Sequence, residues 1–364
     1  MTIKDVTSCL EELAPLKYAE EFDNVGLLVG DYKTEVNGVL VTLDTLENVV
    51  DEAIKKNCNL IVSFHPIIFS GLKKLNGNNY VERVVLKAIK YDIAIYAIHT
   101  ALDNSINGVS AKMAEKIGLS NTKVLLPKQG LIKKLTTYVP IKDAEKVRNV
   151  LFQAGAGAIG NYNECSFNID GLGTYKGNKD SNPSKGEKGR LHSENETFIS
   201  VIFEKHLEQN ILQNLFDAHP YEEVAYDIVT TDNHHQNIGM GIYGDLPKDM
   251  AEKQFLSFLK ETFHLQSIRH STMLHKPIKK VAVLGGSGSF AIEAAKRCGA
   301  DIYISADFKY HDFYKAENKI VLADIGHYES EQFTKNLLVD YLTKKFRNFA
   351  IVLSEKNTNP INYL

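Results

Sequence analysis

The sequence predicts an α/β protein with a doubly wound core sheet that is interrupted by an inserted ferredoxin-like unit. Short β-branched apolar runs alternate with amphipathic helical stretches, a rhythm typical of βαβ crossovers in a mostly parallel sheet. These runs carry few polar residues, as expected of strands covered on both faces. The pattern changes between residues 130 and 235, where the predicted order is strand, helix, strand, strand, helix, strand. We therefore predict core halves at residues 1–129 and 236–364, with the inserted unit between them.

Composition narrows the class of protein. A chain of 364 residues with 44% hydrophobic and 24% charged residues has the ordinary make-up of a globular protein of two or three domains. The net charge of −3 argues against general nucleic-acid binding. No apolar run is long enough for a membrane span, and the first residues form an amphipathic helix pattern rather than a signal peptide. Four scattered cysteines without a CxxC pair favour a reducing cytoplasm.

The first half of the core alternates helices and strands in order. A helix is predicted over residues 3–13 and ends before Pro15. The segment EEFDNVGLLVG follows as a turn and a short strand, and Asn24 in that turn is a candidate to line a pocket. Three apolar strands come next, with the sequences VLVTLD, LIVSFH and IAIYAIH, separated by the amphipathic helices LENVVDEAIKKN and YVERVVLKAIKYD. The segment GVSAKMAEKIGL then predicts another helix.

The inserted unit contains one long polar run, residues 174–196, which predicts a mobile loop. His219 in this unit is predicted to be a surface histidine. After the insertion the core should resume and complete the same sheet, with a helix in MAEKQFLSFLKETF and strands in KKVAVLGG, DIYISAD and IVLAD. A last helix should begin at His327 and run on through EQFTKNLLVDYLTKKF.

Three of the predicted strands end in a histidine, and this pattern points to a metal site. The residues are His65, His99 and His327, and two of them are followed four positions later by a carboxylate, Asp103 or Glu331. Residues four apart lie on one face of a helix. Because ligands collect outside the carboxyl ends of parallel strands, we expect all five side chains to converge.

The donor set favours particular ions and a particular chemistry. Imidazole and carboxylate groups suit Zn²⁺, Fe, Mn or Ni better than Ca²⁺ or Mg²⁺. Five ligands exceed what one tetrahedral ion uses, so up to two divalent ions per chain are predicted, and paired ions typically activate water for hydrolysis. His99 and His311 are the candidates for proton transfer, while the catalytic residues themselves stay unassigned. The loop Gly285–Ser289 could instead bind an anion through its amides, or serve as a tight strand-to-helix turn.

Seven motifs occur in a fixed order along the chain: FDNVGLLVG, SFHPIIFSGLKKL, AIHTALDNSINGVS, PYEEVAYDI, VLGGSGS, DFKYHDF and ADIGHYESE. Together they resemble the GTP cyclohydrolase I type 2 homologue family, also called Nif-three-like proteins, over nearly the whole chain. The resemblance implies an α/β core with a dinuclear metal site in a toroidal homohexamer. It also implies that the insertion is similar to the PII and CutA proteins.

Carried over by motif, the metal ligands are His65, Asp103, His327 and Glu331, with His99 beside them. The family motif has two adjacent histidines before the proline, whereas this chain has Phe64 followed by His65. A phenyl ring has no lone pair to donate, so the sequence predicts one tightly held and one weakly held ion.

Two functions from different classes follow. The first is a divalent-metal-binding, metal-dependent hydrolase, cyclohydrolase-like by family name, that acts on a nucleotide or another phosphorylated small molecule. The second is a non-catalytic metal-binding or regulatory hexameric assembly that works through protein partners. The Gly-Ser loop and open strand ends favour the first function. The polar loop and the PII-like insertion favour the second.

Overall fold

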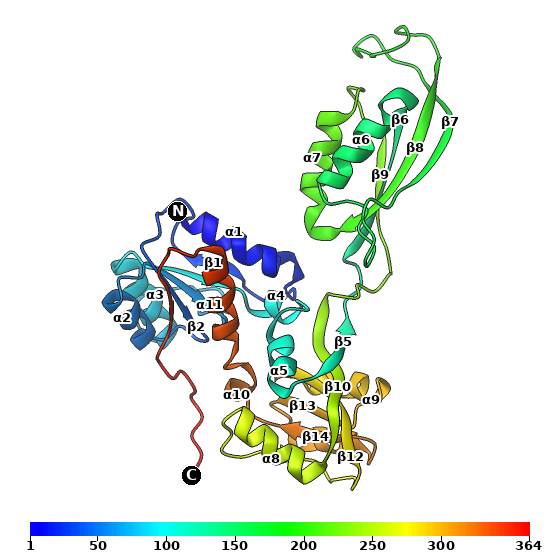
Figure 1. Cartoon of the computed structure of the whole chain (residues 1–364). Helices are drawn as coiled ribbons and strands as arrows, with labels where there is room; N and C mark the ends of the chain where they lie inside the picture. The colour runs from blue at the N-terminus through cyan, green and yellow to red at the C-terminus, as the bar shows by residue number, and fades with distance from the viewer. The chain divides into compact units, whose positions relative to one another are not determined.

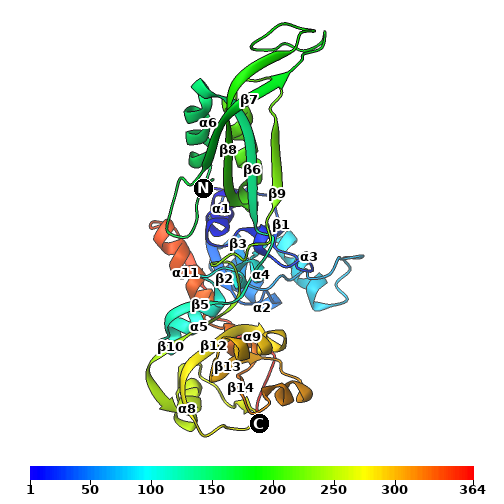
Figure 2. The ribbon, with the colours of Figure 1, turned by 90° about the vertical axis from the view of Figure 1, so that its right-hand side faces the viewer.

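The computed structural model describes residues 1–364, and the chain forms two compact units. One unit combines Met1–Pro127 with Asn237–Leu364, and the other is Lys128–Gln236. Figures 1 and 2 show the elements of both units. No helix is both long enough and apolar enough to cross a membrane. All four cysteines are free thiols.

The first sheet of the larger unit is built mainly from the first quarter of the chain. Its strand order is β1 (Gly26–Val29), β4 (Ala94–Ala97), β3 (Leu60–Ser63), β2 (Val39–Thr42) and β15 (Ile351–Leu353). Only β1 runs antiparallel to its neighbour. Separate apolar clusters cover the two faces, one with α1 (Ile3–Leu13) and α11 (Thr334–Lys345), the other with α2 (Glu47–Lys55) and α3 (Tyr80–Lys90). The predicted first helix is confirmed, and Thr2 and Asp5 form its capping box.

The second sheet of this unit is built mainly from the last third of the chain. Its order is β11 (Arg269–His270), β14 (Val321–Asp324), β13 (Ile302–Ala306), β12 (Pro277–Ser287), β10 (Gly239–Ala251) and β5 (Ser120–Pro127). The central strands β12, β13 and β14 are parallel. One face packs on α5 (Val109–Ile117) and α8 (Glu252–Thr262), and the other on α9 (Ile292–Arg297) and the 3₁₀ segment η4 (Tyr310–Ala316).

The prediction of one core sheet is therefore wrong, because the two halves of the chain form two separately covered sheets. The predicted last helix is also divided, into α10 (His327–Glu331) and α11. Helix α10 packs on the second sheet, whereas α11 packs on the first. The chain then adds β15 beside β2, in parallel register from Ile351 with Val39.

The smaller unit contains β6 (Ile132–Pro140), α6 (Ile141–Gln153), β7 (Phe167–Tyr175), β8 (His192–Glu204), α7 (Glu208–Ala218) and β9 (Tyr226–Thr230). Its four-stranded sheet has the order β7-β8-β6-β9, and every neighbouring pair is antiparallel. Both helices pack on one face of this sheet (Figures 1 and 2), around a core that includes Val147, Ile199 and Leu215.

Of the polar run predicted as a loop, residues 176–191 connect β7 to β8 with several internal ties, whereas residues 174–175 end β7 and residues 192–196 begin β8. The Tyr175 hydroxyl donates to the Lys185 carbonyl at 3.0 Å, and the Gly189 amide donates to the Gly177 carbonyl at 2.8 Å. The Asn182 amide donates to the Glu222 carboxylate at 2.5 Å, which joins the loop to the segment after α7. This loop lies at the end of the β7–β8 hairpin in Figure 1.

Candidate metal centre

The candidate site lies where β3, β4 and β14 end. His65 follows β3 by two residues, His99 begins the short helix α4 (His99–Asp103), and His327 begins α10. The ring of His65 lies 5.2 Å from the ring of His99 and 5.5 Å from the ring of His327, measured between centroids. The predicted convergence of the three histidines is therefore found, although their strands belong to two different sheets.

His65, His327 and Glu331 form the tightest group of donor atoms. The Nε2 atoms of both histidines lie 3.2 Å from the Oε2 atom of Glu331. One ligand atom from each residue falls within 4.8 Å of the other two. The Glu331 side chain is buried, and its Oε2 atom has no hydrogen-bond partner. Burying a carboxylate oxygen without a hydrogen bond costs folding free energy. A divalent cation bound by this oxygen and the two imidazole nitrogens would offset that cost.

An aspartate lies behind each histidine of this group. The Nδ1–H of His65 donates to Asp44 at 2.8 Å, and that of His327 donates to Asp307 at 2.7 Å. Each carboxylate fixes the ring orientation and leaves the Nε2 lone pair for a metal. Asp44 and Asp307 were not predicted as site residues. The signal was in the sequence, since VLVTLD and DIYISAD each end a strand with an acid at the same edge as the histidines.

His99 has the same kind of support from a third aspartate. Its Nδ1–H donates to Asp23 at 2.8 Å, and the amide and hydroxyl of Thr100 donate to the same carboxylate. Burial raises the pKa of Asp23, but the hydrogen bonds from His99 and Thr100 outweigh it and lower that pKa to about 2. His99 also has an unusual backbone φ of 22°, so its position is held against local strain.

The charges of the donor group are strongly coupled. Burial lowers the pKa of His65, yet Glu331 and Asp44 raise it to about 10. For His327, burial is again outweighed, here by Asp307 and Glu331, and its pKa rises to about 11. Burial raises the pKa of Glu331, but the two imidazoles lower it to about 2. The Glu331 carboxylate therefore stays ionised, which is the form that binds a metal.

Asp103 lies in the same cavity as His99, His327 and Glu331, which has a volume of about 250 Å³. Burial, and then the Glu331 charge, raise the pKa of Asp103 well above its usual value. It stands outside the close group of three donor atoms. A second cation would favour the ionised form of the Asp103 carboxyl group, so Asp103 could bind such an ion beside the three close donors.

The glycines of the loop Gly285–Ser289 leave room for the Glu331 carboxylate. A Cβ atom on Gly286 would lie 2.4 Å from Oε1 of Glu331, and a Cβ on Gly285 would lie 2.5 Å from a methyl of Val109. The Gly286 amide already donates to the Ser330 hydroxyl at 2.9 Å, and Gly286 has a φ of 70°. The glycines therefore let the carboxylate approach the strand end, and the Gly286 amide is not free for an anion.

Two predicted candidates, His311 and Asn24, do not line the cavity, whereas Phe64 lies beside His65. His311 is exposed on η4, where its ring contacts Tyr310 and Tyr314, and it does not line the cavity. Asn24 donates to the Ile68 carbonyl at 2.6 Å and is not a lining residue either. Phe64 is fully buried in the apolar core, with its ring 4.8 Å from that of His65.

Comparison with known proteins places the chain in a family. The family model described as Duf34/NIF3 (NGG1p interacting factor 3) matches residues 1–360. A Bacillus subtilis (strain 168) protein named GTP cyclohydrolase 1 type 2 homolog is 38% identical over 368 aligned residues, which cover 99% of this chain and 98% of the relative.

The chain belongs to the Duf34/NIF3 family.

Two solved structures share the fold over the full length. A Bacillus cereus protein related to NIF3 is 36% identical and superposes with a TM-score of 0.86, covering 100% of this chain and 99% of the other. A Staphylococcus aureus protein is 30% identical, with a TM-score of 0.79 and the same coverage. The predicted resemblance to the Nif-three-like proteins is thereby confirmed.

Proposed function

We propose that this chain is a metal-dependent hydrolase of the Duf34/NIF3 family. The observation that carries the proposal is the buried Oε2 atom of Glu331, which faces the Nε2 atoms of His65 and His327 and has no hydrogen-bond partner. A bound divalent ion supplies Lewis acidity and makes water a competent nucleophile near neutral pH. The residue set suits Zn, Fe, Mn or Ni.

Up to two ions bind each chain in this proposal. The first is held tightly by His65, His327 and Glu331. The second is held weakly near Asp103, because the family's other histidine position is occupied by the buried ring of Phe64. His99 is then the proton-transfer group, since it lines the cavity and its ring is oriented by Asp23.

The proposed substrates are nucleotides or other phosphorylated small molecules. The exposed rings of Phe22 and Phe290 line the cavity beside Asp103 and His327. Two exposed aromatic side chains next to a metal centre suit a ligand that pairs a flat ring with an anionic group. The phosphate would be held by the metal, because the Gly286 amide is already bonded to Ser330.

The proposed assembly is a homohexamer, and the unit Lys128–Gln236 is proposed to be a ferredoxin-like insertion of the PII and CutA kind. Its β-α-β-β-α-β element order and its antiparallel strand order β7-β8-β6-β9 support that description. Light scattering of the purified chain measures the assembly directly, and a mass near six chains is the expected result.

Hydrolysis by metal-loaded protein tests the function. The panel contains nucleoside triphosphates, nucleoside monophosphates and a generic phosphodiester, assayed with wild type and with Glu331→Ala. We expect slow, metal-dependent hydrolysis of the generic ester, and ring opening of GTP at a marginal rate or none. Robust ring opening of GTP that disappears in the variant would replace this assignment with a cyclohydrolase. Absence of any metal-dependent turnover would favour the second candidate, a non-catalytic regulatory assembly.

A further inference from the structure

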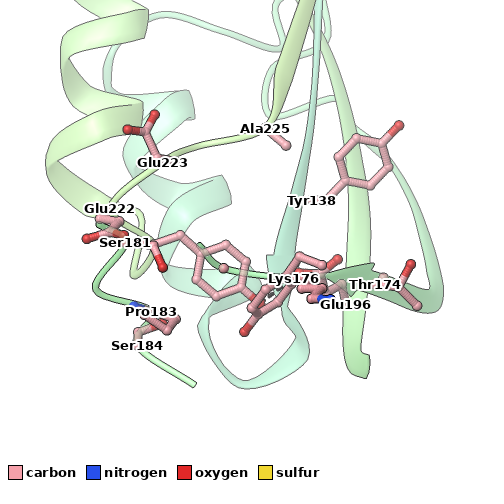
Figure 3. Close-up of a pocket in the computed structure, with 14 residues that line it drawn as sticks. Tyr138, Thr174, Lys176, Ser181, Pro183, Ser184, Glu196, Glu222, Glu223 and Ala225 are labelled. Carbon is pink, nitrogen blue, oxygen red and sulfur yellow. Dashed lines mark hydrogen bonds between the residues drawn. The ribbon is translucent and has the colours of Figure 1, made fainter. Parts of the chain in front are cut away.

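The smaller unit contains a cavity that the metal centre does not use. It has a volume of about 420 Å³, which is large enough for a ligand the size of an amino acid or a nucleoside. It lies between the sheet, the loop after β7 and the segment after α7. Figure 3 shows Tyr138 and Glu196 on one side, with Ser181 and Pro183 on the other. Every lining residue belongs to the unit Lys128–Gln236.

Aromatic rings form much of the apolar wall. Tyr138, Tyr175 and Tyr221 all line the cavity. The rings of Tyr175 and Tyr221 meet edge to face, with 5.8 Å between their centroids. Tyrosine rings present a negative π face, to which organic cations are attracted.

A buried carboxylate completes the wall. Glu196 is only 8% exposed, and its Oε1 atom accepts a hydrogen bond from the Tyr221 hydroxyl at 2.7 Å. Burial, and then the Glu196 carboxylate, raise the pKa of Tyr221, so the phenol stays a neutral donor. The hydrogen bond from Tyr221 uses Oε1 alone, so the second oxygen, Oε2, retains the capacity to accept from a ligand.

Gly173 leaves room for this carboxylate, and His219 holds two of the lining tyrosines. A Cβ atom on Gly173 would lie 1.8 Å from Oε2 of Glu196, so any larger residue would displace the carboxylate from its present position. The buried ring of His219 accepts from the Tyr221 amide at 3.1 Å and donates to the Tyr138 carbonyl at 3.0 Å. His219 is thus a buried support for two lining tyrosines, and its prediction as a surface residue is wrong.

The charge balance of the lining selects the sign of the ligand. Three carboxylates, Glu196, Glu222 and Glu223, line the cavity, against a single ammonium group, Lys176. The Lys176 side chain is exposed to solvent. An anionic ligand would therefore meet an excess of negative charge, whereas a cation would meet both the carboxylate and the rings.

From these contacts we infer a second ligand site in this cavity, specific for a small organic cation with a flat apolar part. An ammonium or guanidinium group of the ligand donates to Oε2 of Glu196. The apolar part packs against Tyr138, Tyr175 and Tyr221. All lining residues belong to the unit Lys128–Gln236, whereas the metal ligands belong to the other unit.

Binding of three matched probes to the full chain tests the site. Phenethylammonium carries the cation, 2-phenylethanol is its neutral counterpart and 3-phenylpropanoate is its anionic counterpart. We expect phenethylammonium to bind with a Kd of about 1 mM or below, and at least about tenfold more tightly than either counterpart, because a charged hydrogen bond is lost in both. This comparison needs no variant.

Glu196→Gln removes the charge while its amide oxygen still accepts from Tyr221. We expect it to weaken phenethylammonium binding by about tenfold or more. Glu187→Gln is the matched control, since Glu187 sits on the exposed loop, pairs with Arg190 and does not line the cavity. Wild-type affinity in Glu196→Gln would overturn the inference. So would tighter binding of 3-phenylpropanoate, equal binding of 2-phenylethanol, or no saturable binding of the cation up to about 10 mM.

Discussion

Two buried glutamates, one in each unit, show how surroundings decide the role of the same side chain. Glu331 and Glu196 are both less than a tenth exposed, and both sit against a glycine whose Cβ would collide with the carboxylate. Glu331 faces two imidazole nitrogens, whereas Glu196 faces a tyrosine hydroxyl and aromatic rings. The first set of neighbours offers lone pairs to a metal. The second offers a π surface to an organic cation.

The histidines of the two units also differ in their pKa shifts and in the partners of their ring nitrogens. Carboxylates beside His65 and His327 raise their pKa values, whereas burial lowers the pKa of His219. Each metal-centre histidine uses Nδ1 to bind an aspartate, which leaves Nε2 for a ligand. His219 uses both ring nitrogens on backbone groups and keeps none for a ligand. A histidine is thus a ligand or a support according to what occupies its second nitrogen.

The largest expected effect is loss of the metal in Glu331→Ala. The substitution leaves two imidazoles without their shared anion, so affinity should fall by more than the roughly 10–100-fold that loss of an outer partner costs. Elemental analysis after gel filtration measures the metal content. Glu317→Ala, which removes an exposed carboxylate, is the control and should retain the wild-type content. Full metal content in Glu331→Ala would remove the basis of the proposed centre.

The next effect concerns the aspartates behind the histidines. Asp44→Asn and Asp307→Asn each keep the shape of the side chain but lose the charge that orients a ring, so each should weaken metal binding by about 10–100-fold. Competition with a coloured chelator gives the affinity. Asp51→Asn, on an exposed ion pair with Lys87, should match wild type. If Asp44→Asn and Asp307→Asn bound the metal as tightly as wild type and as the Asp51→Asn control, the two aspartates would have no part in the site.

Substituting the glycine beside each buried glutamate, Gly286 or Gly173, tests whether the two sites can be disrupted one at a time. Gly286→Ala should destabilise the protein by about 1–3 kcal/mol, since its φ is 70° and its Cβ would meet Glu331. The same variant should also lose metal. Gly173→Ala should instead retain metal and lose phenethylammonium binding, because its Cβ would meet Glu196. Thermal melts, metal analysis and probe titration of both variants check this, and loss of both ligands in either variant would contradict it.

Phe64→His tests whether the histidine missing at this position weakens the binding of the second metal ion. The new imidazole would stand beside His65, so we expect the second ion to bind about tenfold more tightly. The change should also cost about 1–3 kcal/mol of stability, because a polar ring enters an apolar core. Metal counting after dialysis against a mild chelator should rise from about one ion per chain toward two. Two retained ions in the wild type would show that another group replaces the missing histidine.

The smallest effect is a pH dependence in the smaller unit. Burial lowers the pKa of His219 from its ordinary value of 6.5, so the unfolded chain binds a proton more readily than the folded one. Stability from this residue is present above pH 6.5 and is lost as pH falls through the window below it. The protection of the amides in β6 and α7 against hydrogen exchange, taken relative to the unfolded chain at the same pH, should therefore fall on acidification, and less so in His219→Gln. Identical pH profiles would contradict this account.

Much of the fold was determined by the sequence alone. Apolar runs ending in His65, His99 and His327 predicted strand ends that meet, and the spacing of His327 and Glu331 predicted one helical face. The structure contains these strands and the helix α10. Short-range periodicity is enough for such features, because strand and helix patterns repeat within a few residues.

The tertiary structure decided what no local pattern encodes. Apolar strands look alike whichever sheet they join, so the division into two sheets and the return of β15 to β2 depended on packing. The pairings of Asp44, Asp307 and Asp23 with their histidines join residues 20 to 76 positions apart. The burial of His219 and of Glu196, which ends the polar run of residues 174–196, was hidden for the same reason. Whether a polar side chain is a surface group or part of a site is fixed by long-range contacts, which one-dimensional spacing does not contain.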